Sequence, residues 1–391
     1  MSTRFRSIAT AGVLAVLAFG LYASRIGTLP LSPAEIEVVA QADAVGSIAI
    51  GFPLFFHVGD EHWLQPLAVY ATALTRLATS SDLAGRLAAA VTGAVNVALM
   101  FVLCQRLLAS TPAATGAALL LTLTPAHIVT ATTGIDAIYP LPFVLAWLIS
   151  LTIYFDSRER RFAAAGAFAL GVGVYANPSA PLTMAFLLAV TLVAICRSGR
   201  RDAASLAIPA AAFGLPLVVA GAWLVANPSA YPDTLGRWAI HAAHLRSPID
   251  LAKALVNWNT LGTRASLYWG FFDPSWLFFN GPPAPASPLR GLAPFLFATG
   301  LALVAGVSQR LRGAWSPVTL LLLAGLAVAP LAASTFGEAH AVVNAMVVVP
   351  LVVVLAAGGV AGWVARDDSW RWLGWSMIAI LTIHGAWFVA S

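Results

Sequence analysis

The chain has 391 residues, of which 60% are hydrophobic and only 9% are charged, and its mean hydropathy is +0.85. Soluble domains carry about 25% charged residues, because water has to meet polar groups, so this composition excludes a water-soluble protein and indicates a lipid bilayer as the solvent. The formal net charge is +5, and its basic residues are distributed by membrane side, so it does not indicate a nucleic-acid surface. The two cysteines, Cys104 and Cys196, are too few for a disulfide framework or a clustered zinc site.

Apolar runs close to the ~20 residues that a membrane-spanning helix needs recur along the chain. The first run follows Arg4 and Arg6 and is not followed by a clear cleavage site, so we expect an uncleaved anchor helix. A shorter apolar piece, residues 125–135, lies between two of the runs. The runs lie near residues 8–24, 66–79, 86–108, 111–124, 137–155, 162–175, 178–196, 203–225, 291–308, 316–334, 341–363 and 373–390.

Clusters of arginine predict the orientation of these helices, because short cytoplasmic loops of membrane proteins are enriched in Lys and Arg. The clusters can all lie on that side only if residues 125–135 form a short crossing of their own. The sequence then predicts about 13 transmembrane helices in one domain, with the N-terminus cytoplasmic and the C-terminus outside. The alternative of about 12 helices would place Arg158–Arg161 outside, so we reject it. The domain is residues 1–391, and the clusters are Arg4/Arg6, Arg76/Arg86, Arg158/Arg160/Arg161, Arg197/Arg200/Arg201, Arg310/Arg312 and Arg366/Arg371.

Two long segments fall on the outer side of this arrangement, at about residues 25–65 and 226–290. Both contain amphipathic stretches, and the second is rich in Trp and Tyr, which favour the headgroup layer, so we expect surface helices in both. The cytoplasmic side has mostly tight basic turns. The prediction is therefore an all-α polytopic membrane protein whose elaborate face, where any chemistry is expected, is the outer one.

The first outer segment contains Ser32-Pro33-Ala34-Glu35. A serine followed by proline and, three residues after the serine, by glutamate predicts a helix N-terminus with a capping box. One interpretation makes Glu35 a structural cap. The other makes Glu35 an acidic group that faces a cavity at the membrane surface and acts as a base or a metal ligand.

Polar side chains also occur directly before the second apolar run and in the last outer turn. His62 follows Asp60 and Glu61, where either a solvated loop or a contact to substrate or metal explains the group. Glu338 and His340 lie in the last outer turn. A lone histidine in such a turn is more often a satisfied interface residue than a ligand.

Asp136 begins the apolar run at residues 137–155. A helix cap would explain it, but an isolated carboxylate beside an apolar helix is costly and favours a functional role. The predicted topology places Asp136 on the same side as Glu35. No phosphate-binding glycine loop, nucleophile elbow or HExxH motif is present, which excludes P-loop pumps, α/β-hydrolases and zincins.

Several short strings occur in a characteristic order: Pro33-Ala34-Glu35, Pro53-Leu54-Phe55-Phe56, Gln65-Pro66-Leu67 with Tyr70, Thr124-Pro125-Ala126-His127, Asp136 with Tyr139-Pro140-Leu141-Pro142-Phe143, Ser266-Leu267-Tyr268-Trp269, Asp273-Pro274-Ser275-Trp276-Leu277-Phe278-Phe279, and Gly337-Glu338. In this order they resemble the C-type membrane glycosyltransferases over nearly the whole chain. The group they resemble is the family 39-like one, which is related to protein mannosyltransferases and lipid A aminoarabinose transferases.

The resemblance implies a glycosyltransferase that takes a sugar from a polyprenyl-phosphate donor and transfers it to a glycan, lipid or protein acceptor at the periplasmic face of a bacterial inner membrane. Such a reaction needs a base for the acceptor hydroxyl and cations for the departing phosphate. We expect Glu35 and Asp136 to be the catalytic carboxylates, and no cofactor is specified, although a divalent metal ion is left open. The side chains expected to contact substrate are His62, Gln65, Tyr139, Arg237, His241, Arg264, Glu338 and His340, with Arg237, His241 and Arg264 near the phosphate.

The chain departs from the family pattern at the position of the family's aspartate, where it has Ala34. Arginines that the resemblance implies near Thr132 and Val343 are also missing. Enzymatic activity is therefore left open, and the alternative is an inactive relative that binds lipid-linked sugar or a membrane partner. A transporter is a third hypothesis, disfavoured because the acidic residues gather at one membrane surface and no internal repeat is visible.

Overall fold

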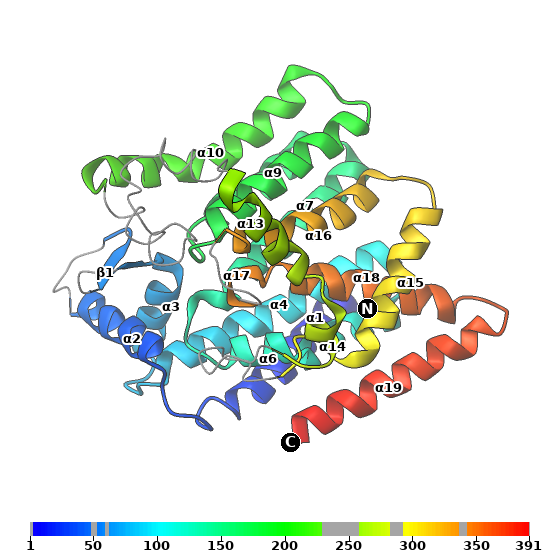
Figure 1. The fold of residues 1–391 in the computed structure, drawn as a ribbon, viewed down its shortest axis with the longest axis horizontal. Helices are drawn as coiled ribbons and strands as arrows, with labels where there is room; N and C mark the ends of the chain where they lie inside the picture. The colour runs from blue at the N-terminus through cyan, green and yellow to red at the C-terminus, as the bar shows by residue number, and fades with distance from the viewer. Residues whose placement is uncertain are drawn as a thin grey trace.

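The structure is a computed structural model that describes residues 3–47, 53–58, 62–228, 258–281, 292–335 and 342–390. These residues are mostly helical, and their only strands form an antiparallel hairpin of β1 (Phe56–Val58) and β2 (His62–Leu64) (Figure 1). The helices are α1 (Thr3–Ala23), α2 (Pro33–Gly46), α3 (Pro66–Arg76), α4 (Ala84–Leu108), α5 (Thr111–Leu123), α6 (Pro125–Ala131), the 3-10 helix η1 (Asp136–Ile138), α7 (Pro140–Ser157), α8 (Arg160–Gly173), α9 (Ala180–Arg197), α10 (Ala203–Ala226), α13 (Trp258–Gly270), α14 (Pro274–Phe278), α15 (Phe297–Arg312), α16 (Pro317–Ala333), α17 (Val342–Ala345), α18 (Val348–Val364) and α19 (Trp370–Ala390).

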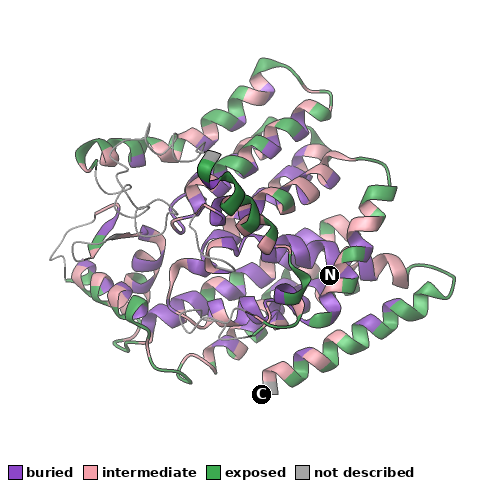
Figure 2. Cartoon of the chain, in the orientation of Figure 1, coloured by how far each residue is buried: buried purple, intermediate pink, exposed green. Residues whose placement is uncertain are grey.

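The burial pattern is that of a bundle surrounded by lipid. Central helices such as α4 and α18 are largely buried, whereas α10 and α19 lie at the rim and are mostly exposed (Figure 2). The exposed side chains at the rim are large and apolar, among them Val16, Leu215 and Ile383. A helix that is apolar on all sides needs an apolar surrounding, so these faces are suited to contact with hydrocarbon chains.

Glycine allows a close contact between α15 and α18. A Cβ built on Gly359 of α18 would clash with the carbonyl oxygen of Ala302 in α15. A Cβ built on Gly306 of α15 would clash with the carbonyl of Leu355 in α18. Small residues at both positions therefore let the two backbones touch, as is common where helices pack inside a membrane.

Six described helices are long and apolar enough to cross a bilayer, or seven if α5 and α6, bent by 63° relative to each other, form one broken span. The six are residues 6–23, 84–108, 136–157, 180–197, 203–226 and 370–389, and α16 and α18 are shorter apolar helices. The polytopic, all-α character that the sequence predicts is therefore present, while the expected count of about 13 crossings is not reached by these helices on length and composition alone.

Two of the expected crossings are wrong. The run at residues 66–79 forms α3, which has 11 residues and ends at Arg76. At about 1.5 Å per residue, α3 is roughly half as long as the ~30 Å hydrocarbon core is thick. The piece at residues 125–135 forms α6, which has only 7 residues, so it is not a crossing of its own.

The assignment of Arg76 and Arg86 to the face of the other arginine clusters is also wrong. Arg76 pairs with Asp43 of α2 at 2.6 Å and Arg86 pairs with Glu35 at 2.6 Å, so both lie at the end of the bundle that holds the first outer segment. Arg106, about 30 Å from Arg86 along α4, pairs instead with Asp156 at 2.7 Å. A run of one helix long enough to cross a bilayer therefore separates the two groups of arginines.

Candidate functional site

The capping box predicted at the start of α2 is confirmed. The backbone N–H of Glu35 donates to the hydroxyl of Ser32 at 3.3 Å, and the backbone N–H of Ser32 donates to Oε2 of Glu35 at 2.8 Å. Pro33 occupies the first helical position, where its missing N–H is no loss. The cap explains why α2 begins here and points the Glu35 side chain back toward the bundle.

Glu35 also forms a buried ion pair with Arg86 at the start of α4, and the two residues are 2% and 3% exposed. The guanidinium binds in a bidentate way, with Nε to Oε1 at 2.6 Å and Nη2 to Oε2 at 2.9 Å. Its remaining N–H groups donate to the carbonyl oxygens of Ile26, Leu29 and Pro30 at 2.7 to 2.8 Å. Because every donor has a partner, this pair meets the condition under which a buried charge pair is tolerated.

The same carboxylate holds the segment that leads to Asp136. The backbone N–H of Gly134 donates to Oε1 of Glu35 at 2.8 Å. A Cβ built on Gly134 would lie 3.0 Å from the carbonyl carbon of Gly85 and 3.1 Å from the amide nitrogen of Arg86, so a glycine is needed for this approach. Glu35 and Asp136 therefore lie at the same end of the bundle, joined by a two-residue step of chain.

The surroundings of Glu35 make it a poor base. Burial alone would raise the pKa of Glu35, but hydrogen bonds from Arg86, Gly134 and Ser32 and the charge of Arg86 outweigh burial and lower the pKa to about 2. A base works best when its pKa is near the working pH. The neighbouring Ala34, where the resemblance implies an aspartate, is exposed on α2.

Asp136 has a different environment. It begins η1, directly before α7, and its side chain is half-buried. Within the described part of the chain, no other residue pairs with this carboxylate or donates a hydrogen bond to it. Tyr139 follows at the end of η1 and is buried, next to Thr92 of α4. Asp136 is thus a carboxylate with lone pairs left free for a ligand.

Two further segments meet η1 at this end of the bundle. The turn between α8 and α9 is held against α17 by Asn177 Nδ2, which donates to the carbonyl oxygen of Val343 at 3.4 Å, and by the Ser179 hydroxyl, which donates to that of Asn344 at 2.8 Å. α17 in turn packs on η1. Asn177 and Ser179, like Arg86, are site-building residues that the sequence reasoning missed, although Asn-Pro-Ser between two apolar runs is a visible turn signal.

A buried polar cluster fixes α6, which leads into the Asp136 segment. The Tyr22 hydroxyl of α1 lies 3.0 Å from Nδ1 of His127, and Nε2 of that ring lies 3.5 Å from Nδ2 of Asn96 in α4. All of these side chains are fully buried. His127 therefore joins α6 to α1 and α4 through polar contacts, as an interhelical link and not as a metal ligand.

Gln65 lies at the N-cap of α3 and is 3% exposed. Its Oε1 atom is buried and accepts no hydrogen bond in the described part of the chain. The hairpin that precedes it packs on the end of α10, where Trp223 contacts Phe55 at 4.8 Å and Trp63 at 5.0 Å between ring centroids. The Gln65 side chain is thus buried at the start of α3 with an oxygen that lacks a described partner, which suits contact with a ligand.

The other predicted contacts are only partly placed by the structure. Arg264 lies on α13, where burial lowers its pKa, and α13 is tied to α16 by the Tyr268 hydroxyl, which donates to the carbonyl oxygen of Ala327 at 2.8 Å. No described contact joins Arg264 to Asp136. Arg237, His241, Glu338 and His340 lie outside the described residues, as does the side chain of His62. Among the residues described, no three His, Cys, Asp or Glu side chains are grouped to hold a metal ion.

Comparison with known proteins places the fold. No protein-family model matches the chain, and no curated protein matches it in sequence. Among solved structures, it is similar to ArnT from Cupriavidus metallidurans bound to undecaprenyl phosphate, with a TM-score of 0.62 and 14% identity over 95% of this chain. The apo state of the same protein gives 0.59 and 14% identity over 97% of this chain and 73% of ArnT.

A third similar structure is the Archaeoglobus fulgidus oligosaccharyltransferase in complex with zinc and sulfate, with a TM-score of 0.52 and 12% identity over 96% of this chain and 53% of that one. The chain spans 63% of the length of the undecaprenyl-phosphate-bound ArnT. These similarities extend over nearly all of this chain and confirm the fold that the sequence resemblance implied. The chain therefore has the fold of the C-type membrane glycosyltransferases.

Proposed function

We propose that the protein is a membrane glycosyltransferase that transfers a sugar from a polyprenyl-phosphate donor to an acceptor hydroxyl, with Asp136 as the base. The observation that carries the proposal is the free, half-buried carboxylate of Asp136 at the end of the bundle where η1, α17 and the turn between α8 and α9 meet. The similarity to ArnT, whose structure contains undecaprenyl phosphate, supports the choice of donor. Glu35 acts as a positioning residue that holds the segment before Asp136.

The proposed reaction needs few protein groups. Asp136 accepts the proton of the acceptor hydroxyl as its oxygen attacks the anomeric carbon of the sugar. The bond from that carbon to the phosphate oxygen breaks, and polyprenyl phosphate leaves with the electron pair. Negative charge develops on this leaving phosphate. The proposed contacts for it come from the second outer segment and are Arg237, His241 and Arg264. The acceptor hydroxyl belongs to a glycan, a lipid or a protein.

The proposed topology has about 11 crossings, made by α1, α4, the α5–α6 pair, α7, α8, α9, α10, α15, α16, α18 and α19. Removing residues 66–79 and 125–135 from the expected crossings reverses α4 and α5 and leaves the orientation of every helix after residue 135 unchanged. Arg25, after α1, donates a hydrogen bond to the carbonyl of Val389 at the end of α19, which supports a C-terminus on the side opposite the N-terminus. In a bacterial inner membrane, the arginine distribution favours a periplasmic C-terminus and a periplasmic active site.

The test is sugar transfer by the purified protein supplied with a polyprenyl-phosphate sugar and candidate acceptors, with the product identified by mass spectrometry. Asp136→Asn should lower kcat by about 10²–10⁴-fold. Asp156→Asn is the matched control, because Asp156 is an exposed carboxylate near the far end of α7, the helix that follows Asp136, and is paired with Arg106. Wild-type turnover by Asp136→Asn would exclude Asp136 as the base.

An inactive relative that binds lipid-linked sugar remains the second candidate, and the observation that favours it is Ala34 in place of the family's aspartate. On this alternative the protein retains the donor without consuming it. Turnover by the natural protein with any polyprenyl donor would exclude it. Binding of polyprenyl phosphate without turnover, together with a gain of transfer in Ala34→Asp, would favour it over the enzyme.

A further inference from the structure

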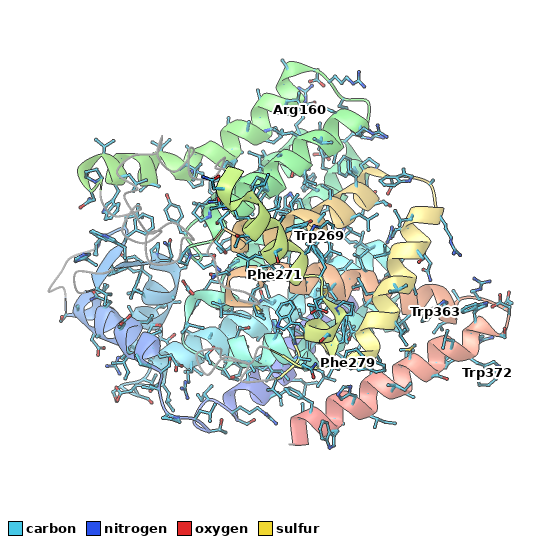
Figure 3. All side chains as sticks on the ribbon, viewed as in Figure 1. Arg160, Trp269, Phe271, Phe279, Trp363 and Trp372 are labelled. Atoms are coloured by element: carbon cyan, nitrogen blue, oxygen red, sulfur yellow. The ribbon has the colours of Figure 1, made fainter. Side chains whose placement is uncertain are left out.

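Two basic turns lie side by side at the end of the bundle opposite Asp136. One joins α7 to α8 and the other joins α9 to α10, and we call residues 156–161 and 197–202 together the basic turn pair. Arg200 Nη1 donates to the carbonyl oxygen of Arg158 at 2.9 Å, and Arg160 pairs with Asp202 at 2.8 Å, so the two turns are bound to each other. Figure 3 shows Arg160 at the edge of the molecule, at the start of α8.

The basic turn pair carries more positive charge than its own acids neutralise. Its three acids are each occupied, because Asp202 pairs with Arg160, Glu159 with Arg161, and Asp156 with Arg106 of α4. No acid in the described part of the chain pairs with the remaining arginines, which are Arg158, Arg197, Arg200 and Arg201. Arg158, Arg197 and Arg201 are exposed. The surface therefore lacks its counter-charges and is complementary to an anionic group.

An exposed apolar stripe runs along α10, the helix that directly follows the turn at residues 197–202. Its members recur at the three-, four- and seven-residue spacing of one helix face. The opposite face of α10, with Phe213 and Ala220, is buried. Figure 2 shows α10 at the rim of the bundle with much of its length exposed. The stripe consists of Ile208, Leu215, Val218, Val219 and Val225.

Charge and stripe together select the kind of partner. An acidic protein domain or a nucleic acid would meet the arginines but would leave the apolar stripe without a contact. A phospholipid meets both, because its phosphate lies at the headgroup layer and its acyl chain lies along the hydrocarbon-facing helix. Arginine suits the phosphate, because its planar fork donates two parallel hydrogen bonds to phosphate oxygens.

We propose that the basic turn pair and the stripe of α10 form a binding site for an anionic phospholipid of the leaflet that this face contacts. Arg197 and Arg201 hold the headgroup phosphate, and one acyl chain lies against Leu215 and Val219. Each arginine at a membrane surface adds attraction to an anionic lipid. The site involves none of the residues that we place in sugar transfer.

The test compares lipid retention by the full chain in nanodiscs of phosphatidylcholine alone or mixed with phosphatidylglycerol, with bound lipids counted by native mass spectrometry after extraction. The wild type should retain phosphatidylglycerol in preference to phosphatidylcholine. The double variant Arg197→Gln/Arg201→Gln should reduce that preference by on the order of tenfold. Neither side chain makes an ion pair in the described structure, so the fold should persist.

The matched control is Arg312→Gln/Arg371→Gln, which removes the same charge from two exposed arginines at the end of α15 and the start of α19. The control should keep the wild-type preference. An equal loss in both double variants would overturn the proposal, since the preference would then follow net charge alone. No preference in the wild type would also overturn it. Should the double variant fail to fold, Leu215→Gln tests the same site without a change of charge, and an unchanged preference there would reject the acyl contact.

Discussion

Glu35 and Asp136 are two carboxylates at the same end of one helix bundle, and their surroundings assign them different tasks. Glu35 accepts hydrogen bonds from Arg86, Ser32 and Gly134 and has no oxygen left for a ligand. Asp136 is half-buried and accepts no hydrogen bond from another described residue. A saturated carboxylate stabilises a structure, whereas an unsaturated one is free for chemistry. The comparison predicts that changes around Glu35 affect stability first, and that changes at Asp136 affect activity alone.

The largest effect on stability is expected from Arg86→Leu. It leaves Glu35 as a buried charge without its partner and removes the donors to three carbonyl groups, so the free energy of unfolding should fall by about 3–5 kcal/mol. The measurement is denaturant-induced unfolding in detergent. Arg76→Leu is the control, because the Arg76–Asp43 pair is partly exposed and should contribute at most about 1 kcal/mol. Equal losses of stability in the two variants would show that the buried Arg86–Glu35 pair contributes no more than the partly exposed Arg76–Asp43 pair.

A comparable effect is expected from acid. The pKa of Glu35 is lowered to about 2 from 4.5, so the stability it contributes is complete above pH 4.5 and is lost as the pH falls through about 2. The lost amount corresponds to about 3 kcal/mol. Thermal unfolding followed from neutral pH downwards should show this loss in the wild type and not in Glu35→Gln, which starts lower. Parallel curves for the two proteins would show that Glu35 is not anionic in the folded state.

A smaller effect is expected from Gly134→Ala. The added methyl group meets the backbone of Gly85 and Arg86, so the segment before Asp136 has to move, at a cost of about 1–3 kcal/mol. Sugar transfer should fall with it. Gly116→Ala is the matched control, because a Cβ there meets nothing within 4 Å, and it should leave stability unchanged or raise it by up to about 1 kcal/mol. An active and stable Gly134→Ala protein would show that the packing of Gly134 against Gly85 and Arg86 does not position Asp136.

The smallest effect on stability is expected from Asp136→Asn. No described partner is lost, so the free energy of unfolding should change by less than about 0.5 kcal/mol, while transfer activity is lost. The same purified sample serves for both measurements. A large loss of stability would reveal a structural role for Asp136 and remove the distinction between the two carboxylates.

The sequence predicts the parts of the fold that depend on local chemistry. Ser32-Pro33-Ala34-Glu35 specifies the start of α2 through its cap, and apolar runs specify helices because hydrocarbon leaves the backbone no other partner. The same reasoning fails for α3 and α6, because a run of apolar residues does not show whether a helix ends early or bends. Residues 66–79 and 125–135 are two such errors, and they cancel in the orientation of every helix after residue 135 but not in that of α4 and α5.

The site is less predictable than the fold, because it depends on contacts between distant residues. Arg86 looks like a basic residue at the edge of a span, and nothing near it in sequence indicates a partner 51 positions earlier. The glycine at position 134 and the turn at Asn177 and Ser179 are ordinary residues until the helices are packed. Asp136, by contrast, is visible from the sequence because a lone carboxylate beside an apolar run is rare.

The early end of α6 has a consequence for hydration. α6 ends at Ala131, and residues 133–135 lie outside any helix near the end of a span, although the Thr132 N–H still donates to the carbonyl oxygen of Val129 at 3.2 Å. Hydrocarbon cannot solvate free backbone groups, and Glu35 supplies a partner only to the amide of Gly134. We therefore expect water to reach this segment, which would let a polar acceptor approach Asp136 without crossing lipid.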